Sequence, residues 1–107
     1  MSNLFDISQF DLSAKEEIVH SLISHRLVRI ERIISYGQIS NEWYDQQEDE
    51  WVVLLQGNAT LIFEEEQQEI SMEKGSYLFI PAHKKHKVTF TSKQPPCIWL
   101  AIYLNKE

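Results

Sequence analysis

The chain has 107 residues, of which 43% are hydrophobic and 24% are charged, proportions that are typical of a folded globular protein. This length predicts one domain over residues 1–107. Lys and Arg number 10 and Asp and Glu number 16, and the resulting net charge of −6 disfavours nucleic acid and anionic membranes as partners. The lone cysteine, Cys97, excludes an internal disulfide and a Cys-rich zinc site.

Two features of the chain bear on its location in the cell. Residues 1–10 lack a basic start followed by an apolar block, so we expect no signal peptide. No stretch approaches the run of about 18 apolar residues that spans a bilayer. We therefore expect a soluble, cytoplasmic protein without a membrane partner.

Residues 1–26 predict an N-terminal arm followed by one short helix. The arm, residues 1–12, carries large apolar side chains that favour docking on an apolar surface. These side chains include Leu4, Phe5, Ile7 and Phe10. Ser13 and Glu16 fit the Ser-x-x-Glu capping box at the start of a helix. Ile18, Val19 and Leu22 continue as one apolar stripe at helical spacing, so we expect a helix that begins at Ser13.

Residues 27–107 predict a β-barrel or sandwich. Short runs rich in β-branched or alternating residues are separated by turn residues at intervals of about 8–12 residues, which is typical of all-β folds. The predicted strands cover residues 27–34, 51–55, 59–63, 70–72, 77–80, 87–91 and 97–104. The same pattern disfavours a parallel α/β sheet.

The segment 50–90 resembles the cupin family, whose first motif ends in E-x6-G and whose second motif begins G-x5-P. Glu50 and Gly57 have the spacing of the first motif, and Gly75 and Pro81 have the spacing of the second. His86 falls at the histidine of the second motif. The resemblance implies an all-β double-stranded β-helix of the jelly-roll type, here with one short N-terminal helix.

The chain departs from the family's metal-binding pattern of three His and one Glu. If four residues lie between the H-x-H pair of the first motif and Glu50, the pair falls on Trp43 and Asp45. If three residues lie between them, it falls on Tyr44 and Gln46. Phe90 replaces the final Asn of the second motif. Direct transfer of the family's ligands therefore leaves only Glu50 and His86.

A metal site is still consistent with the chemistry of four residues. Asp45 and Glu50 offer carboxylates, and His83 and His86 offer imidazoles, a set that suits Zn, Fe, Ni or Mn. In the alternative, Asp45 lies in a polar turn, His83 is an exposed loop residue, Glu50 belongs to a solvated charge run, and His86 is a hydrogen-bonded strand residue.

Strand periodicity predicts a ligand pocket with a polar mouth and an apolar interior. Alternate residues of a strand share one face, so Glu50 and His86 each have apolar residues of the same parity below them. Trp43 and Tyr44 are expected to line the pocket rim or an interface. The predicted pocket residues are Trp43, Tyr44, Val52, Leu54, Val88 and Phe90.

These residues support two classes of function. In the first, Glu50 and His86 are catalytic: a bound metal acts as a Lewis acid on a small oxygenated metabolite, or Glu50 is a general base whose pKa is raised by the apolar pocket. In the second, the chain is a non-enzymatic binding module or a structural dimer without metal. A homodimer is expected because the apolar arm suits an exchange between two copies, and because the apolar final strand, 97–104, forms an edge that is normally covered.

Overall fold

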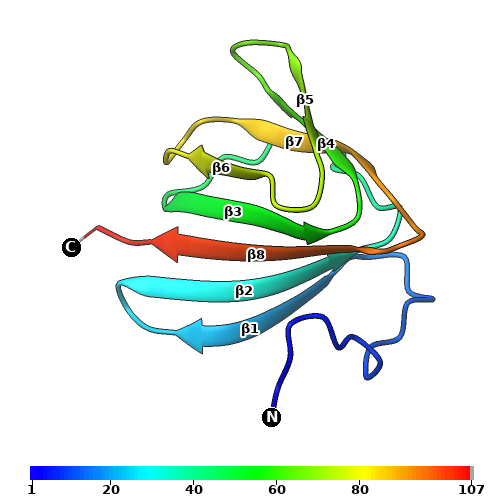
Figure 1. The fold of residues 1–107 in the computed structure, drawn as a ribbon. Helices are drawn as coiled ribbons and strands as arrows, with labels where there is room; N and C mark the ends of the chain where they lie inside the picture. Colours follow the sequence, from blue (N-terminus) through cyan, green and yellow to red (C-terminus); the bar gives the residue numbers. More distant parts are fainter. Residues whose placement is uncertain (107) are drawn as a thin grey trace.

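A computed structural model describes residues 1–106, and over these residues the chain forms eight β-strands. The strands are β1 (Ile18–Ser24), β2 (Val28–Ser35), β3 (Asp49–Gln56), β4 (Ala59–Phe63), β5 (Glu69–Met72), β6 (Tyr77–Ile80), β7 (His86–Thr91) and β8 (Cys97–Leu104). They form two antiparallel sheets, with the strand orders β1-β2-β8-β3-β6 and β5-β4-β7 (Figure 1). The predicted all-β class is confirmed, as are the strands predicted after residue 26.

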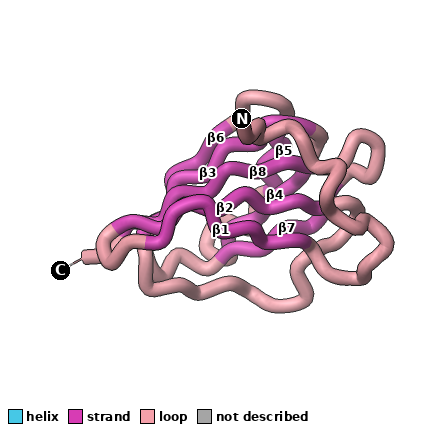
Figure 2. Tube along the Cα trace, turned by 90° about the horizontal axis from the view of Figure 1, so that it is seen from below, coloured by secondary structure: helices cyan, strands magenta, loops and turns pink. Residues whose placement is uncertain are grey.

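The predicted N-terminal helix is wrong. Residues 18–24 form strand β1, and no helix occurs among residues 1–106 (Figure 2). Ile18, Val19 and Ile23 are β-branched, which favours a strand once β2 offers a pairing edge. The expected capping residue, Ser13, bonds backwards instead, because its backbone N and its Oγ both donate to Asp11 Oδ1, at 2.9 and 2.6 Å.

Strand β8 is central rather than an edge, so the expectation that residues 97–104 need a covering surface is also wrong. β8 pairs with β2 on one side and with β3 on the other (Figure 1). Its backbone groups are therefore used within the chain. The described residues contain no helix able to cross a membrane.

The strand register decides which side chains of the five-stranded sheet face the three-stranded sheet. Arg29 on β2, Tyr103 on β8, Glu50 on β3 and Ile80 on β6 are cross-strand partners and form the first row of this inner face. Further rows toward the opposite end of the strands hold Glu31, Ala101, Val52 and Leu78, then Ile33, Trp99 and Leu54, then Ser35 and Cys97. The inner face is thus polar at its first row and mainly apolar beyond it.

The hydrophobic core fills the space between the two sheets. The buried core residues are Val52, Leu54, Ala59, Leu61, Phe63, Met72, Cys97, Trp99, Ala101 and Tyr103, with Ile80. Gly57 allows the close approach of β3 to β8, because its φ is +92° and an added Cβ would lie 2.9 Å from the Cα of Cys97. The glycine of the E-x6-G motif therefore has a steric role in this chain.

The N-terminal arm is held on the outer face of the five-stranded sheet by Arg32. This side chain is 4% exposed, and its Nη1 donates to the carbonyl oxygens of Asn3, Leu4 and Asp6 at 3.0–3.2 Å. The Phe10 ring lies 5.1 Å from the guanidinium carbon. Polar contacts to a buried cation, as well as apolar contacts, therefore attach the arm.

Candidate functional site

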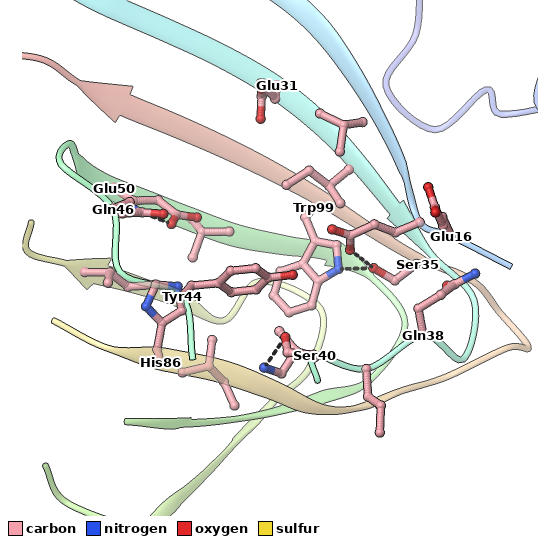
Figure 3. A pocket seen from close by; sticks show the side chains of 18 of the residues that line it. Glu16, Glu31, Ser35, Gln38, Ser40, Tyr44, Gln46, Glu50, His86 and Trp99 are labelled. Carbon is pink, nitrogen blue, oxygen red and sulfur yellow. Dashed lines mark hydrogen bonds between the residues drawn. The ribbon is translucent and has the colours of Figure 1, made fainter. Parts of the chain in front are cut away.

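A cavity of about 730 Å³ lies between the two sheets and reaches residues 15–17, which precede β1. Strands β2, β3, β6 and β8 supply one wall, and β4 and β7 supply the other. Figure 3 shows Glu50, Gln46 and His86 at one end, Ser35 and Gln38 at the other, and Trp99 between them. We call these the Glu50 end and the Ser35 end.

Glu50 is a buried carboxyl group at the first end. It is 6% exposed, and its Oε1 accepts a hydrogen bond of 2.9 Å from Gln46 Nε2. Burial raises the pKa of Glu50, because removal from water penalises the charged form, and the Gln46 bond only partly opposes this effect. Its second oxygen has no hydrogen-bond partner among residues 1–106.

Tyr103 lies beside Glu50 in the first row and is 8% exposed. Burial raises the pKa of Tyr103, and the neighbouring Glu50 carboxyl raises it further, so the phenol stays protonated. Arg29 lies against the ring, 3.9 Å from its centroid, and is itself bound by Glu31 and Glu48. The Tyr103 hydroxyl has no hydrogen-bond partner within the described chain, although the residue lines the cavity.

His86 contributes a hydrogen-bond acceptor from the opposite sheet. It begins β7, is 5% exposed, and its Nδ1 lies 3.0 Å from the carbonyl oxygen of Lys84. A carbonyl only accepts, so Nδ1 carries the hydrogen and the neutral ring has its lone pair on Nε2. Burial lowers the pKa of His86, which favours this neutral form. Tyr44 bridges to His86 through its backbone, and the two rings are 5.7 Å apart.

The Ser35 end carries a short hydrogen-bond chain. Trp99 Nε1 donates to Ser35 Oγ at 3.1 Å, and Ser35 Oγ donates to Glu17 Oε2 at 3.4 Å. Burial raises the pKa of Glu17. Glu17 reaches the cavity from the segment before β1, together with Lys15 and Glu16. The N-terminal segment therefore forms part of the cavity mouth.

The four predicted metal ligands separate into two pairs. Glu50 and His86 line the cavity, whereas His83 Nδ1 lies 2.8 Å from Asp45 Oδ1 in an exposed pair outside it. Nowhere in residues 1–106 do three or more His, Cys, Asp or Glu side chains converge as a metal site would require. Of the four predicted ligands, the cavity thus receives one carboxyl and one imidazole.

Of the predicted pocket residues, three line the cavity and three do not. Tyr44, Val52 and Val88 belong to its wall. Leu54 is fully buried in the core, and Trp43 lies outside under the Lys87 ammonium.

Phe90 points to solvent and is 50% exposed, so its predicted place in the pocket is wrong. The register of β4 and β7 shifts by one residue at Thr89, because Leu61 pairs with Val88 but Thr60 pairs with Phe90. This β-bulge reverses the alternation after Val88.

The structure also separates the two alignments of the missing H-x-H pair. Tyr44 and Gln46 line the cavity, whereas Trp43 and Asp45 do not. The alignment with three intervening residues before Glu50 is therefore the one that matches the site.

The sequence analysis missed Tyr103 and Trp99. Both share a face of β8 with Cys97 and Ala101, so the alternation of that strand could have indicated them.

The comparisons with known proteins agree with this architecture. The family model described as "Cupin domain" matches residues 32–103. A crystal structure named "putative mannose-6-phosphate isomerase" from Ralstonia eutropha JMP134 is 36% identical, covers 99% of this chain and 98% of its own, and has a TM-score of 0.89. A cupin superfamily protein from Desulfitobacterium hafniense DCB-2 is 23% identical, with coverages of 92% and 86% and a TM-score of 0.75. No curated protein matches the sequence.

The chain belongs to the cupin domain family. The double-stranded β-helix expected from its motifs is confirmed, and an RmlC-like cupin with that fold from Methanocaldococcus jannaschii has a TM-score of 0.70 at 18% identity.

Proposed function

We propose that this chain binds a small oxygenated metabolite in the cavity between its sheets. The observation that carries the proposal is the set of unsatisfied polar atoms at the Glu50 end. Glu50, Tyr103 and His86 are all more than nine-tenths buried, and each has one polar atom without a partner in residues 1–106. Within residues 1–106 the fully buried side-chain polar atom without a partner is Arg32 Nε, so these three atoms stay open to the cavity and are available to a ligand that enters it. Together they offer donors and an acceptor for hydroxyl or carbonyl oxygens.

Binding in this proposal does not depend on a resident metal. A Zn, Fe, Ni or Mn ion in a family site has three His and one Glu, and of that set this chain places only one His, His86, in the cavity wall formed by the described residues, beside Glu50. Gln46, whose amide binds Glu50, replaces one of the missing histidines. The residues present at the cavity therefore do not fit the transition-metal ion of a family site. Elemental analysis of protein purified without chelator or His tag tests this point, and a stoichiometric transition metal would contradict it.

Proton transfer on the bound metabolite is a second candidate function. The pKa of Glu50 is raised and that of His86 is lowered, and shifts in these directions suit an acid and a base that exchange protons near neutral pH. The similar Ralstonia protein carries the name of an isomerase, and one route of sugar isomerisation is the removal and return of a proton. A loss of turnover in both Glu50→Gln and His86→Ala that is much larger than their loss of binding would favour this candidate.

A ligand-observed NMR screen against neutral and charged oxygenated fragments tests the binding proposal. We expect some fragments to bind the wild-type protein, and we expect the binding signals of these fragments to weaken with Glu50→Gln and with His86→Ala. The matched control is His83→Ala, which removes an imidazole from the exposed pair outside the cavity. Hits that respond to His83→Ala but not to the two cavity variants would contradict the proposal, as would the absence of any hit.

We also propose that two copies of the chain associate through the outer face of the five-stranded sheet. An apolar row crosses all five strands of this face and consists of Ile23, Ile30, Ile102, Trp51 and Phe79. The next row adds Leu100, Val53 and Tyr77, and the arm covers its Arg32 end. Charged side chains are absent from the exposed part of both rows within the described chain, so the face avoids the repulsion expected between two chains of charge −6.

The size of this face argues for a second copy rather than a small ligand. Tyr77 and Phe79 are 66% and 54% exposed, which leaves on the order of 200 Å² of aromatic surface uncovered. A stable dimer buries about 800 Å² per partner, so the interface must extend along both rows.

Light scattering after gel filtration tests the dimer. We expect twice the chain mass of 12.6 kDa for the wild type and the monomer mass for Phe79→Glu. Phe90→Glu is the matched control, because Phe90 is 50% exposed on the other sheet. A monomeric wild type would contradict the proposal.

We further propose a cytoplasmic location, in keeping with the buried free thiol of Cys97.

A further inference from the structure

We infer that the ligand of this cavity is an elongated hydroxylated amine, with its oxygen at the Glu50 end and its ammonium group at the Ser35 end. The inference rests on the proposed function and adds the charge and the length of the ligand. It follows from the order of side chains along the cavity.

The carboxyl groups occupy both ends of the cavity. Glu50 lies at one end, and Glu17 is bonded to Ser35 at the other, with Glu16 also in the wall there. Arg29 on β2 lies in the row of Glu50, and Ser35 lies six positions further along the same strand, which corresponds to roughly 20 Å. A ligand that uses both ends must therefore be long.

The middle of the cavity is apolar and aromatic. Trp99 lies between the two ends, and the ring of Tyr44 extends toward it (Figure 3). At this depth Ile33, Val52, Leu61 and Val88 supply aliphatic wall, while Glu31, in the row of Val52, and Ser40 are polar. This surface suits a hydrocarbon segment, and the Trp99 ring also attracts an adjacent ammonium group.

Cations available to an anionic ligand are scarce. Lys15 is the single Lys or Arg side chain in the cavity wall formed by the described residues, against Glu16, Glu17, Glu31 and Glu50. Arg29 lies behind the Glu50 end, but its guanidinium is already held by Glu31 and Glu48 and stacked on Tyr103. A phosphate or carboxylate group would therefore meet mainly like charge, whereas an ammonium group meets an opposite one.

Three probes of equal length and different charge test the inference: 10-aminodecan-1-ol, decane-1,10-diol and 10-hydroxydecanoate. Calorimetric or NMR titration at one pH and one ionic strength compares them on the full chain. We expect the amine to bind about fivefold more tightly than the diol, and the carboxylate to bind most weakly. We expect 3-aminopropan-1-ol, which is too short to reach both ends, to bind more weakly than the long amine.

Glu17→Gln tests the position of the ammonium group, because the glutamine keeps an acceptor for Ser35 and loses the charge. We expect it to reduce the affinity for the amine by about threefold and to leave that for the diol unchanged. Glu65→Gln is the matched control, since Glu65 is an exposed carboxylate in the turn between β4 and β5.

Three results would overturn the inference: equal or tighter binding of the diol or the carboxylate, an amine preference that survives Glu17→Gln, or no binding of the amine at millimolar concentration. A neutral fragment that binds at Glu50 and His86 in the screen above would still support the proposed function. The two proposals therefore fail by different results.

Discussion

Replacement of Tyr103 by Phe separates a ligand-binding role of its hydroxyl from a structural one. The hydroxyl has no hydrogen-bond partner among residues 1–106, so the variant loses no bond within the chain. The phenyl ring keeps its packing in the core and its contact with Arg29 at 3.9 Å. We therefore expect the free energy of unfolding to change by no more than about 0.5 kcal/mol. The affinity for an oxygenated fragment found by the screen should fall about fivefold, the usual value of one neutral hydrogen bond.

Tyr36→Phe is the matched control, because it removes the same atom where the chain supplies partners. The Tyr36 hydroxyl lies 2.7 Å from the carbonyl oxygen of Ala14 and 2.9 Å from that of Glu16. We expect this variant to lose about 1 kcal/mol of stability. Urea denaturation of both variants, followed by titration with the same fragment, gives the comparison. Destabilisation by Tyr103→Phe equal to that of Tyr36→Phe, with unchanged fragment affinity, would refute the reasoning.

Three further predictions concern the energetics of the fold. Folding raises the pKa of Glu50, so this carboxyl contributes stability at pH below its unfolded pKa and loses that contribution as the pH rises through its folded pKa. The variant Glu50→Gln has no such group, so its free energy of unfolding should rise relative to that of the wild type as the pH is raised to neutral. Urea denaturation of both proteins at a series of pH values measures this difference. Arg32→Met should cost about 3 kcal/mol in urea denaturation and expose residues 1–12 to proteolysis, because three backbone carbonyls lose their buried donor; an arm that stays protected would contradict this. Gly57→Ala should cost about 3 kcal/mol and Gly75→Ala about 1 kcal/mol by thermal unfolding, since both have positive φ but only Gly57 lacks room for a Cβ; equal losses would contradict this.

The strands after residue 26 could be predicted because each alternates or carries β-branched residues between clear turn signals. The first strand could not, because Ile18, Val19, Leu22 and Ile23 fit a helical stripe and a strand equally well by spacing. Pairing with β2 decides between them, and the irregularity between Ser21 and Ile23 hides the strand's alternation. Short segments of this kind are assigned by tertiary contacts rather than by local pattern.

The site was predicted in part, for equally physical reasons. Parity along β3 places Glu50 and Val52 in one wall, and the structure brings His86 to the facing wall of the same cavity. The bulge at Thr89 reverses parity within β7, and nothing in the local sequence signals it. Spacing alone also could not choose between Asp45 and Gln46 as the side chain beside Glu50. That choice depends on the path of the chain before β3.

A crystal structure of the protein soaked with 10-aminodecan-1-ol or with a fragment from the screen tests the central claim most directly. We predict that the bound oxygen lies within hydrogen-bond distance of the Tyr103 hydroxyl, of His86 Nε2 and of Glu50. A ligand bound away from all three atoms, with those atoms satisfied by other side chains of the protein, would contradict the account.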